Sequence, residues 1–326
     1  MEKKGKILSG MRPSGKLHIG HLWGAISNWV GLQDEYDCHY MVADLHALTT
    51  EYAETSQIRQ NTLEMIADWL ACGIDPARSI LFRQSRVKQH SELHLFLSMI
   101  IPLGWLFRLS TYKEQLKELK ERDLHTYGFL GYPVLQAADI VLYKANAVPV
   151  GEDQLPHLEL SREIVRRFNG FYGKIFPEPK AILTQDPRIP GTDGRKMSKS
   201  YNNAIFLSDA PEDILKKTMS MFTDPKKIKV TDPGHPGKCV VFAFHKIYSE
   251  NYKEIEKQCK AGVIGCVKDK KDLAACVIKA LEPVREKRDQ IIKNPNYVEK
   301  ILKSGEEKAS EIAEKTMREV KEAVKL

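Results

Sequence analysis

This chain of 326 residues is predicted to be an α/β protein, with a doubly wound parallel sheet followed by an all-α domain. Two observations support this. Short apolar runs alternate with helical patterns over residues 1–200, and strand-like runs almost vanish beyond residue 205. Strands that alternate with helices form parallel sheets joined by crossover helices. The first part is therefore expected to have a Rossmann-like fold.

The predicted strands are apolar runs at residues 6–10, 39–43 and 79–83. In open parallel sheets, ligands bind beyond the carboxyl ends of the strands. The turn after the first strand, and the residues Asp44 to His46 after the second, are therefore expected to border a binding site.

Helical patterns follow these strands at residues 20–31, at residues 56–73 and, strongly apolar, at residues 129–143. The hydroxyl of Thr55 or Ser56 can cap the second helix, and Gly73 ends it.

Beyond the composition change near residue 205, further helices are predicted at residues 211–222, 240–249, 273–292 and 297–324. We therefore expect two domains. Residues 1–204 form the sheet domain, which includes a helical insertion around residues 85–145, and residues 205–326 form the helical domain.

The composition fits a chain with a sizeable core, since 42% of the residues are hydrophobic and 29% are charged. We expect a cytoplasmic protein, because no apolar run is long enough to span a membrane and no signal-peptide pattern follows the N-terminus. The net charge of +7 permits a polyanionic partner, but an ordinary basic protein would carry it equally well.

Two short motifs carry the strongest functional signal: His18-Ile19-Gly20-His21, and Lys196-Met197-Ser198-Lys199-Ser200. A site for ATP needs close backbone approach, helix N-terminal amides and mobile cations. His18 and His21 are three residues apart and share one face of a helical turn, where both can donate to phosphate oxygens. Alternatively, the two histidines only cap the helix.

In the second motif, Lys196 and Lys199 lie in a segment that includes Gly191 and Gly194. Flexible loops of this kind often act as lids, and lysine carries a compact charge on a long stem. We hypothesise that, in a reaction that releases pyrophosphate from ATP, the two lysines hold the pyrophosphate in the transition state. The alternative is a solvated basic loop.

Together the two motifs resemble the nucleotide site of class I aminoacyl-tRNA synthetases. Three further segments narrow the resemblance to tryptophanyl-tRNA synthetases of the bacterial type: residues 44–49 (DLHALT), 132–140 (YPVLQAADI) and 148–162 (VPVGEDQLPHLELSR). The resemblance covers most of residues 5–205 and continues more loosely to the end. Tyrosyl-tRNA synthetases share the motif pair, but usually carry a Gly-Gly-x-Asp-Gln segment where this chain has Val-Gly-Glu-Asp-Gln.

The resemblance implies tryptophan–tRNA ligase activity, with His18, His21, Lys196 and Lys199 as catalytic residues. It implies that ATP is bound by Arg12, Pro13, Ser14, Gly20, His21, Gly151, Glu152, Asp153, Ile189, Lys196, Met197, Ser198, Lys199 and Ser200. Arg12 departs from family members that carry glutamine at this position.

The same resemblance assigns tryptophan to Asp139, Tyr132, Gln154, His46 and Leu8. An indole has one donor and no acceptor, so a selective pocket needs apolar walls and one buried acceptor. Asp139 lies on an apolar helix and by resemblance accepts the indole N–H. The alternatives are a structural, salt-bridged carboxylate for Asp139 and core packing for Tyr132 and His46.

The implied partners are L-tryptophan, tRNA(Trp) and a second copy of the chain in a homodimer. The implied cofactors are ATP and Mg²⁺, with the metal held by phosphates and water rather than by side chains. The helical domain would bind the anticodon, with Lys226, Lys227 and Lys229 as candidates for contacts with the RNA backbone. The rival interpretations are a tyrosine enzyme and a non-catalytic paralogue that binds nucleotide or RNA.

Cys239, Cys259 and Cys266 are candidate ligands of an iron–sulfur cluster, because some members of the family carry a four-cysteine site there. The family pattern ends in Cys-x₂-Cys, whereas this chain has Asp269 in the final place. A decayed site with ordinary packed cysteines is the expected alternative.

Overall fold

The computed structural model describes residues 3–118, 123–183 and 189–326. The chain folds into two compact units. Unit 1 comprises Met1–Gly15, Asn28–Gln185 and Asn294–Leu326, and unit 2 comprises Lys16–Ser27 and Asp186–Lys293. This division differs from the expected boundary at residues 204 and 205, because the C-terminal segment belongs to the unit that contains the sheet.

Unit 1 is built on a five-stranded parallel sheet with the strand order β3-β2-β1-β4-β5. Its strands are β1 (Lys6–Met11), β2 (Asp37–Val42), β3 (Ser79–Arg83), β4 (Ala147–Val150) and β5 (Lys180–Leu183). The order is that of a doubly wound sheet, and its direction reverses between β1 and β4. The predicted parallel α/β architecture is therefore confirmed.

The three predicted strands are found within two residues of their expected bounds. The strands β4 and β5 were not predicted. Each has only four residues, and β4 contains Pro149, which lacks the N–H that a central strand normally donates.

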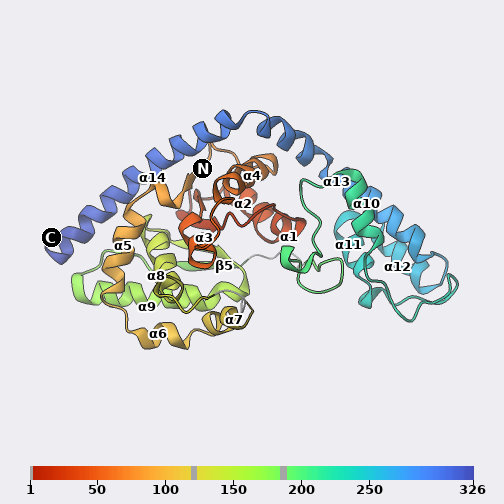
Figure 1. Cartoon of the computed structure of the whole chain (residues 1–326), viewed down its shortest axis with the longest axis horizontal. Helices are drawn as coiled ribbons and strands as arrows, with labels where there is room; N and C mark the ends of the chain where they lie inside the picture. The colour runs from red at the N-terminus through yellow and green to blue at the C-terminus, as the bar shows by residue number, and fades with distance from the viewer. Residues whose placement is uncertain (1–2, 119–122, 184–188) are drawn as a thin grey trace. The chain divides into compact units, whose positions relative to one another are not determined.

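Helices join the strands and surround the sheet (Figure 1). In unit 1 they are α2 (Ser27–Leu32), α3 (Asp44–Glu51), α4 (Ile58–Ala71), the 3₁₀ turn η2 (Gln84–Arg86), α5 (Gln89–Ser98), α6 (Leu103–Arg108), α7 (Ser110–Glu118), α8 (Tyr127–Leu142), the 3₁₀ turn η3 (Glu152–Gln154), α9 (Leu155–Tyr172) and α14 (Pro295–Val324). The predicted cap of α4 was wrong. The helix begins at Ile58, and the Ser56 hydroxyl donates to Glu54 instead.

Both faces of the sheet are covered, as two adjacent residues of β2 show. Successive side chains of a strand point to opposite faces. Tyr40 stacks on Trp29 of α2 with 4.7 Å between ring centroids, and Trp29 contacts Trp69 of α4 edge-on. On the other face, Met41 belongs to the main apolar cluster, together with Phe82 and residues of α5, α8 and α9.

The long helix α14 packs against β3 and contacts α4, α5 and α8 (Figure 1). Its approach to the strand requires a glycine, because a Cβ on Gly305 would lie 1.9 Å from the carbonyl oxygen of Leu81. Arg83, at the end of β3, pairs with Glu299 at 3.0 Å and with Glu306 at 2.5 Å.

In its described residues, unit 2 contains helices and isolated β-bridges but no strand. Its elements are α1 (Ile19–His21), the π-helical turn η1 (Leu22–Ile26), η4 (Lys199–Tyr201), α10 (Pro211–Met219), η5 (Pro236–Lys238), α11 (Val240–Tyr248), α12 (Tyr252–Lys260) and α13 (Cys266–Ile292). The helix α13 packs against α10 and α11. The single helix predicted over residues 20–31 is three elements, α1, η1 and α2, and α12 was not predicted.

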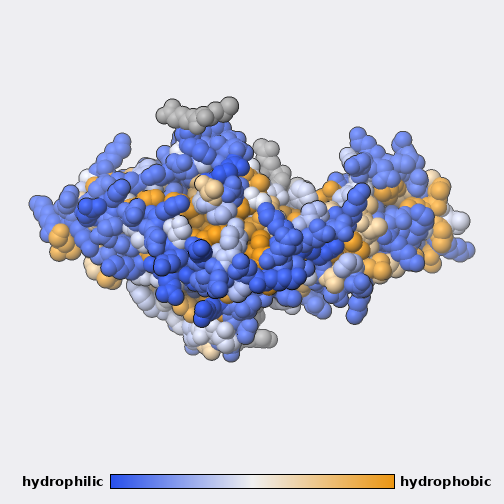
Figure 2. All heavy atoms as spheres, turned by 90° about the horizontal axis from the view of Figure 1, so that it is seen from above, coloured by the Kyte–Doolittle hydropathy of each residue, from blue (hydrophilic) through white to orange (hydrophobic). Residues whose placement is uncertain are grey.

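Hydrophilic residues cover most of the face shown in Figure 2, with hydrophobic residues exposed between them. Among the described residues, no helix combines the length and the apolar character that crossing a bilayer requires.

The contact between α14 and β3 yields a stability prediction. Gly305→Ala is expected to destabilise the protein by about 1–3 kcal/mol, because the added methyl group meets backbone that cannot move aside freely. Gly170→Ala in α9 is the matched control, since a Cβ there meets open space and alanine favours a helix. Thermal unfolding of both variants checks this, and equal midpoints would contradict it.

Candidate active site

The sheet of unit 1 brings four chain segments to its carboxyl edge. Residues 12–14 follow β1, residues 44–46 follow β2, residues 84–86 follow β3 and residues 151–154 follow β4. The strand order reverses between β1 and β4, which is where such sheets bind ligands. The expectation that Asp44 to His46 lie at this edge is met.

Asp139 on α8 is buried, with 2% of its surface exposed, and three side chains donate to its carboxylate. Its Oδ1 accepts from Gln84 Nε2 at 2.8 Å and from His90 Nδ1 at 2.6 Å, and its Oδ2 accepts from His46 Nε2 at 2.8 Å. His90 Nε2 in turn lies 2.8 Å from the Tyr143 hydroxyl.

These hydrogen bonds keep the buried carboxyl group ionised. Burial by itself would raise the pKa of Asp139, but the hydrogen bonds from His46 and His90 outweigh it and lower the pKa to about 2. A carboxylate has about four lone-pair positions, and the described residues fill three of them. One further donor can therefore bind to this charge.

Two members of this cluster were missed from the sequence. Gln84 directly follows β3, so the rule that ligands bind at strand ends could have found it. His90 lies at the start of α5 and is fully buried, and no local pattern marks it.

The other residues predicted for tryptophan also lie in unit 1. Tyr132 is nearly buried, and its hydroxyl lies 2.8 Å from Nε2 of His157. The hydroxyl of Thr111 lies 2.9 Å from the same nitrogen. Tyr132 is therefore held by packing of its ring in an apolar helix and by the polar partner of its hydroxyl. Leu8 is buried on β1, and Gln154 donates to Asp153 at 3.2 Å.

Unit 2 contains both sequence motifs and brings them together. Backbone pairing joins the segments that carry them: Ile19 N donates to Ile205 O at 3.0 Å, and Leu207 N donates to Leu17 O at 2.9 Å. A Cβ on Gly20 would lie 3.5 Å from the Met197 sulfur and 2.9 Å from His18 Nδ1, so glycine gives both side chains room.

The two histidines lie against each other, as their spacing predicted. Their ring centroids are 3.7 Å apart, and His18 N donates to His21 Nδ1 at 3.1 Å. Burial, together with the positive charge of Lys199, lowers the pKa of His18 to about 4, and burial, His18 and Lys199 lower the pKa of His21. Both rings are therefore neutral at pH 7. His18 Nδ1 is buried and has no hydrogen-bond partner among the described residues.

Asn203 restrains the loop that carries Lys196 and Lys199, and it was not predicted from the sequence. Its amide nitrogen donates to Asp193 at 2.7 Å and to the Lys196 carbonyl at 3.1 Å, while its amide oxygen accepts from Ser198 N at 2.8 Å. Asn203 is 2% exposed. The loop backbone is thus restrained by one buried side chain.

The remaining ATP candidates are divided between the units. Arg12, Pro13, Ser14, Gly151, Glu152 and Asp153 belong to unit 1, whereas Ile189 and Ser200 belong to unit 2 with the two motifs. Their common role in binding one nucleotide stays a prediction.

One candidate for RNA contact is corrected by the structure. Lys227 is nearly buried, and its ammonium group donates to the backbone carbonyls of Val230 and Asp232. Its ammonium group therefore stabilises the backbone of the loop at residues 230–232. Lys226 and Lys229 are exposed.

The three candidate thiols of an iron–sulfur cluster belong to unit 2. Burial and the neighbouring Asp269, Cys239 and Cys266 raise the pKa of Cys259 to about 11, so this thiol is protonated at neutral pH. Asp269 lies 3.2 Å from Nε2 of His245. The described residues contain no group of three histidine, cysteine or acidic side chains placed to hold a metal ion.

Comparison with known proteins decides the family. Residues 1–282 match the family model described as tRNA synthetases class I (W and Y). The chain belongs to this family.

Two similar relatives of this synthetase chain are named tryptophan–tRNA ligase. The Thermotoga maritima protein is 50% identical over 98% of this chain and 99% of its own length. The Aquifex aeolicus protein is 47% identical over 98% of this chain and 100% of its own length.

Solved structures agree with these relatives. Tryptophanyl-tRNA synthetase from Campylobacter jejuni, in a complex with ADP and tryptophan, is 34% identical, and the match covers 98% of this chain and all of that chain, with a TM-score of 0.90. Tyrosyl-tRNA synthetase from Archaeoglobus fulgidus, at 21% identity and a TM-score of 0.66, shares the fold.

The proximity of the two motifs can be tested by titration. Lys199→Gln is expected to raise the pKa of His18 above its value of about 4, because it removes one of the two causes that lower it. Burial remains, so the pKa should stay below the ordinary value of 6.5. Histidine NMR resonances followed against pH give the measurement.

Lys216→Gln serves as the control, since this exposed lysine of α10 is not among the groups that shift His18. If Lys199→Gln left the His18 titration unchanged, the two motifs would not be adjacent in solution.

Proposed function

We propose that this chain is a tryptophan–tRNA ligase, which activates L-tryptophan with ATP and transfers it to tRNA(Trp). The observation that carries the proposal is the buried, ionised Asp139 in a chain of the synthetase family. Its remaining acceptor position suits the single N–H donor of an indole, and the apolar helix α8 provides a dry environment. An analogue that lacks this N–H would leave the charge underpaired, which is costly.

In the first step, the tryptophan carboxylate attacks the α-phosphorus of ATP. A bond forms between the carboxylate oxygen and phosphorus, and the bond to pyrophosphate breaks. No general base is needed, because a carboxylate is already ionised at neutral pH. Catalysis then consists of positioning and charge stabilisation.

We assign the charge stabilisation to unit 2. Lys196 and Lys199 would neutralise the departing pyrophosphate, and the neutral rings of His18 and His21 would donate hydrogen bonds to phosphate oxygens. The unpartnered Nδ1 of His18 supports this role, because a buried ring nitrogen gains from a ligand partner. Arg12, Pro13, Ser14, Gly151, Glu152, Asp153 and Ile189 would complete the ATP site.

Within unit 1, Tyr132, Gln154, His46 and Leu8 would surround the amino acid. Mg²⁺ would accompany ATP and screen its phosphate charge. Its ligands would be phosphate oxygens and water. A hydroxyl of the terminal adenosine of tRNA then attacks the carbonyl carbon of the adenylate, and AMP leaves.

We further propose that the helices α10 to α13 of unit 2 bind the anticodon, that the chain acts as a homodimer and that it is cytoplasmic. Membership of the synthetase family supports these assignments. The exposed Lys226 and Lys229 are available for contacts with the RNA backbone.

The test is amino-acid-dependent exchange of pyrophosphate into ATP, measured with each of the twenty amino acids. Tryptophan alone should support rapid exchange. Exchange supported by tyrosine instead would favour the rival tyrosine enzyme, and adenylate formation without tRNA charging would favour the non-catalytic paralogue.

The amino-acid assignment predicts that Asp139→Asn lowers kcat/KM for tryptophan in this exchange about a hundredfold, because a charge-assisted hydrogen bond is lost. The KM for ATP should change little. Asp37→Asn, at an exposed carboxylate where β2 begins, should leave both constants unaltered. An Asp139→Asn enzyme with normal tryptophan kinetics would exclude the assignment.

The charge-stabilising role predicts that Lys199→Ala reduces kcat of exchange by about a hundredfold or more, because the lost cation acts mainly on the transition state. Steady-state exchange kinetics at saturating tryptophan measure the effect. Undiminished exchange would remove Lys199 from the mechanism.

A further inference from the structure

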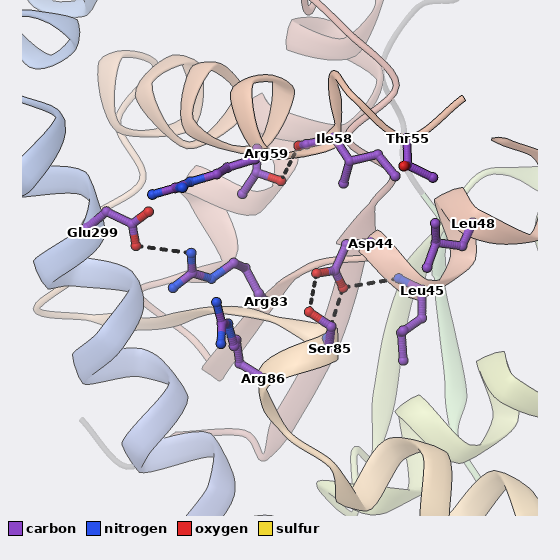
Figure 3. Close-up of a pocket in the computed structure, with 11 residues that line it drawn as sticks. Asp44, Leu45, Leu48, Thr55, Ile58, Arg59, Arg83, Ser85, Arg86 and Glu299 are labelled. Carbon is purple, nitrogen blue, oxygen red and sulfur yellow. Dashed lines mark hydrogen bonds and ion pairs between the residues drawn. The ribbon is translucent and has the colours of Figure 1, made fainter. Parts of the chain in front are cut away.

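Unit 1 contains a pocket of about 530 Å³, which the mechanism above does not use (Figure 3). The start of α3, the start of α4, the turn η2 after β3 and Glu299 of α14 line it. Three of its lining residues are arginines: Arg59, Arg83 and Arg86. In Figure 3 their side chains point toward the side of the pocket where Glu299 lies.

The positive charge of this pocket is only partly compensated. Arg83 forms ion pairs with both neighbouring carboxylates, Glu299 and Glu306. Arg59 and Arg86 are exposed, and neither forms an ion pair or a side-chain hydrogen bond with another described residue. Two guanidinium groups are therefore available to an anion from outside.

The one carboxylate that faces the pocket from α3 is already occupied. Asp44 accepts from Ser85 N at 2.9 Å and from Leu45 N at 3.1 Å, and the Ser85 hydroxyl also donates to it. It therefore does not compete for Arg59 or Arg86. These guanidinium groups can form bidentate hydrogen bonds that match the oxygens of a phosphate.

This pocket lies close to the amino-acid site, because both use the same two elements. Asp44 and His46 are on α3, and Ser85 follows Gln84 in η2. His46 N donates to Gln84 Oε1 at 3.3 Å, and the side chains of both residues donate to Asp139. Leu45 and Ser85, which line the pocket, are the chain neighbours of these two donors, so the pocket adjoins the amino-acid site.

We propose that Arg59 and Arg86 bind a backbone phosphate of the acceptor strand of tRNA. The inference rests on the proposed function. The terminal adenosine must reach the carbonyl carbon of the bound amino acid, so the phosphates that precede it must cross the surface of unit 1 near Asp139. The pocket offers an uncompensated pair of cations there. A small anion would leave most of the 530 Å³ of the pocket unfilled, whereas a strand of nucleotides would occupy more of it.

The test compares Arg59→Gln, Arg86→Gln and the double variant with the double variant R59K/R86K. In the glutamine variants, KM for tRNA(Trp) in charging should rise about fivefold per arginine near 0.1 M salt. The slope of log Kd for tRNA against log salt should fall by about one in the glutamine double variant, because the loss of one phosphate contact releases one counterion fewer. The lysine double variant should keep the slope, since it keeps both charges.

Exchange of pyrophosphate without tRNA should stay unchanged in these variants, which also shows that they are folded. Arg318→Gln, at an exposed arginine of α14 outside the pocket, is the matched control and should alter neither KM nor the slope.

Three outcomes would overturn the proposal. One is an unchanged KM and salt slope in the glutamine double variant. Another is an equal loss of exchange activity, which would make the arginines supports of the amino-acid site. The third is weakened binding of inorganic phosphate with unaltered tRNA affinity, which would indicate a small-anion site. Failure of the proposed function is distinguishable, because wild-type protein would then lack tryptophan-dependent exchange whatever its salt slope.

Discussion

Unit 1 is organised around a single buried negative charge. Asp139 lies on α8, and its three donors come from different elements: Gln84 from η2, His46 from α3 and His90 from α5. An ionised carboxylate away from water is tolerated only when hydrogen bonds replace its hydration. The relative positions of these four elements are therefore tied to one side chain.

The same charge connects stability with recognition. Three donors fill most of the acceptor capacity of Asp139 and keep it ionised, and under the proposed function the position they leave would select ligands with one donor. The Nε2 atom of His90 in turn contacts the Tyr143 hydroxyl, and both side chains are fully buried. This side of the Asp139 carboxylate is therefore held in place away from water. A preorganised acceptor of this kind need not rearrange when a donor arrives.

Unit 2 contains the positive charges of the proposed site, those of Lys196 and Lys199. Burial is the main cause that lowers the pKa of both His18 and His21, and the charge of Lys199 adds to it, so the rings are neutral rather than additional repelling charges. Asn203 restrains the loop backbone while Lys196 remains exposed. The backbone is thereby ordered, and the long lysine stems keep their reach.

The amino-acid sequence was enough to predict the parallel α/β class, the strands β1, β2 and β3, and the two motifs, because periodicity and residue spacing are local properties. Only the tertiary structure placed α14 against β3, joined Gln84 and His90 to Asp139, and turned Lys227 toward backbone carbonyls. Burial and hydrogen bonding depend on which segments, distant along the chain, come into contact in the fold. The spacing of residues along the chain does not predict those contacts. The division into units shows the same limit, since Lys16–Ser27 packs with residues far along the chain.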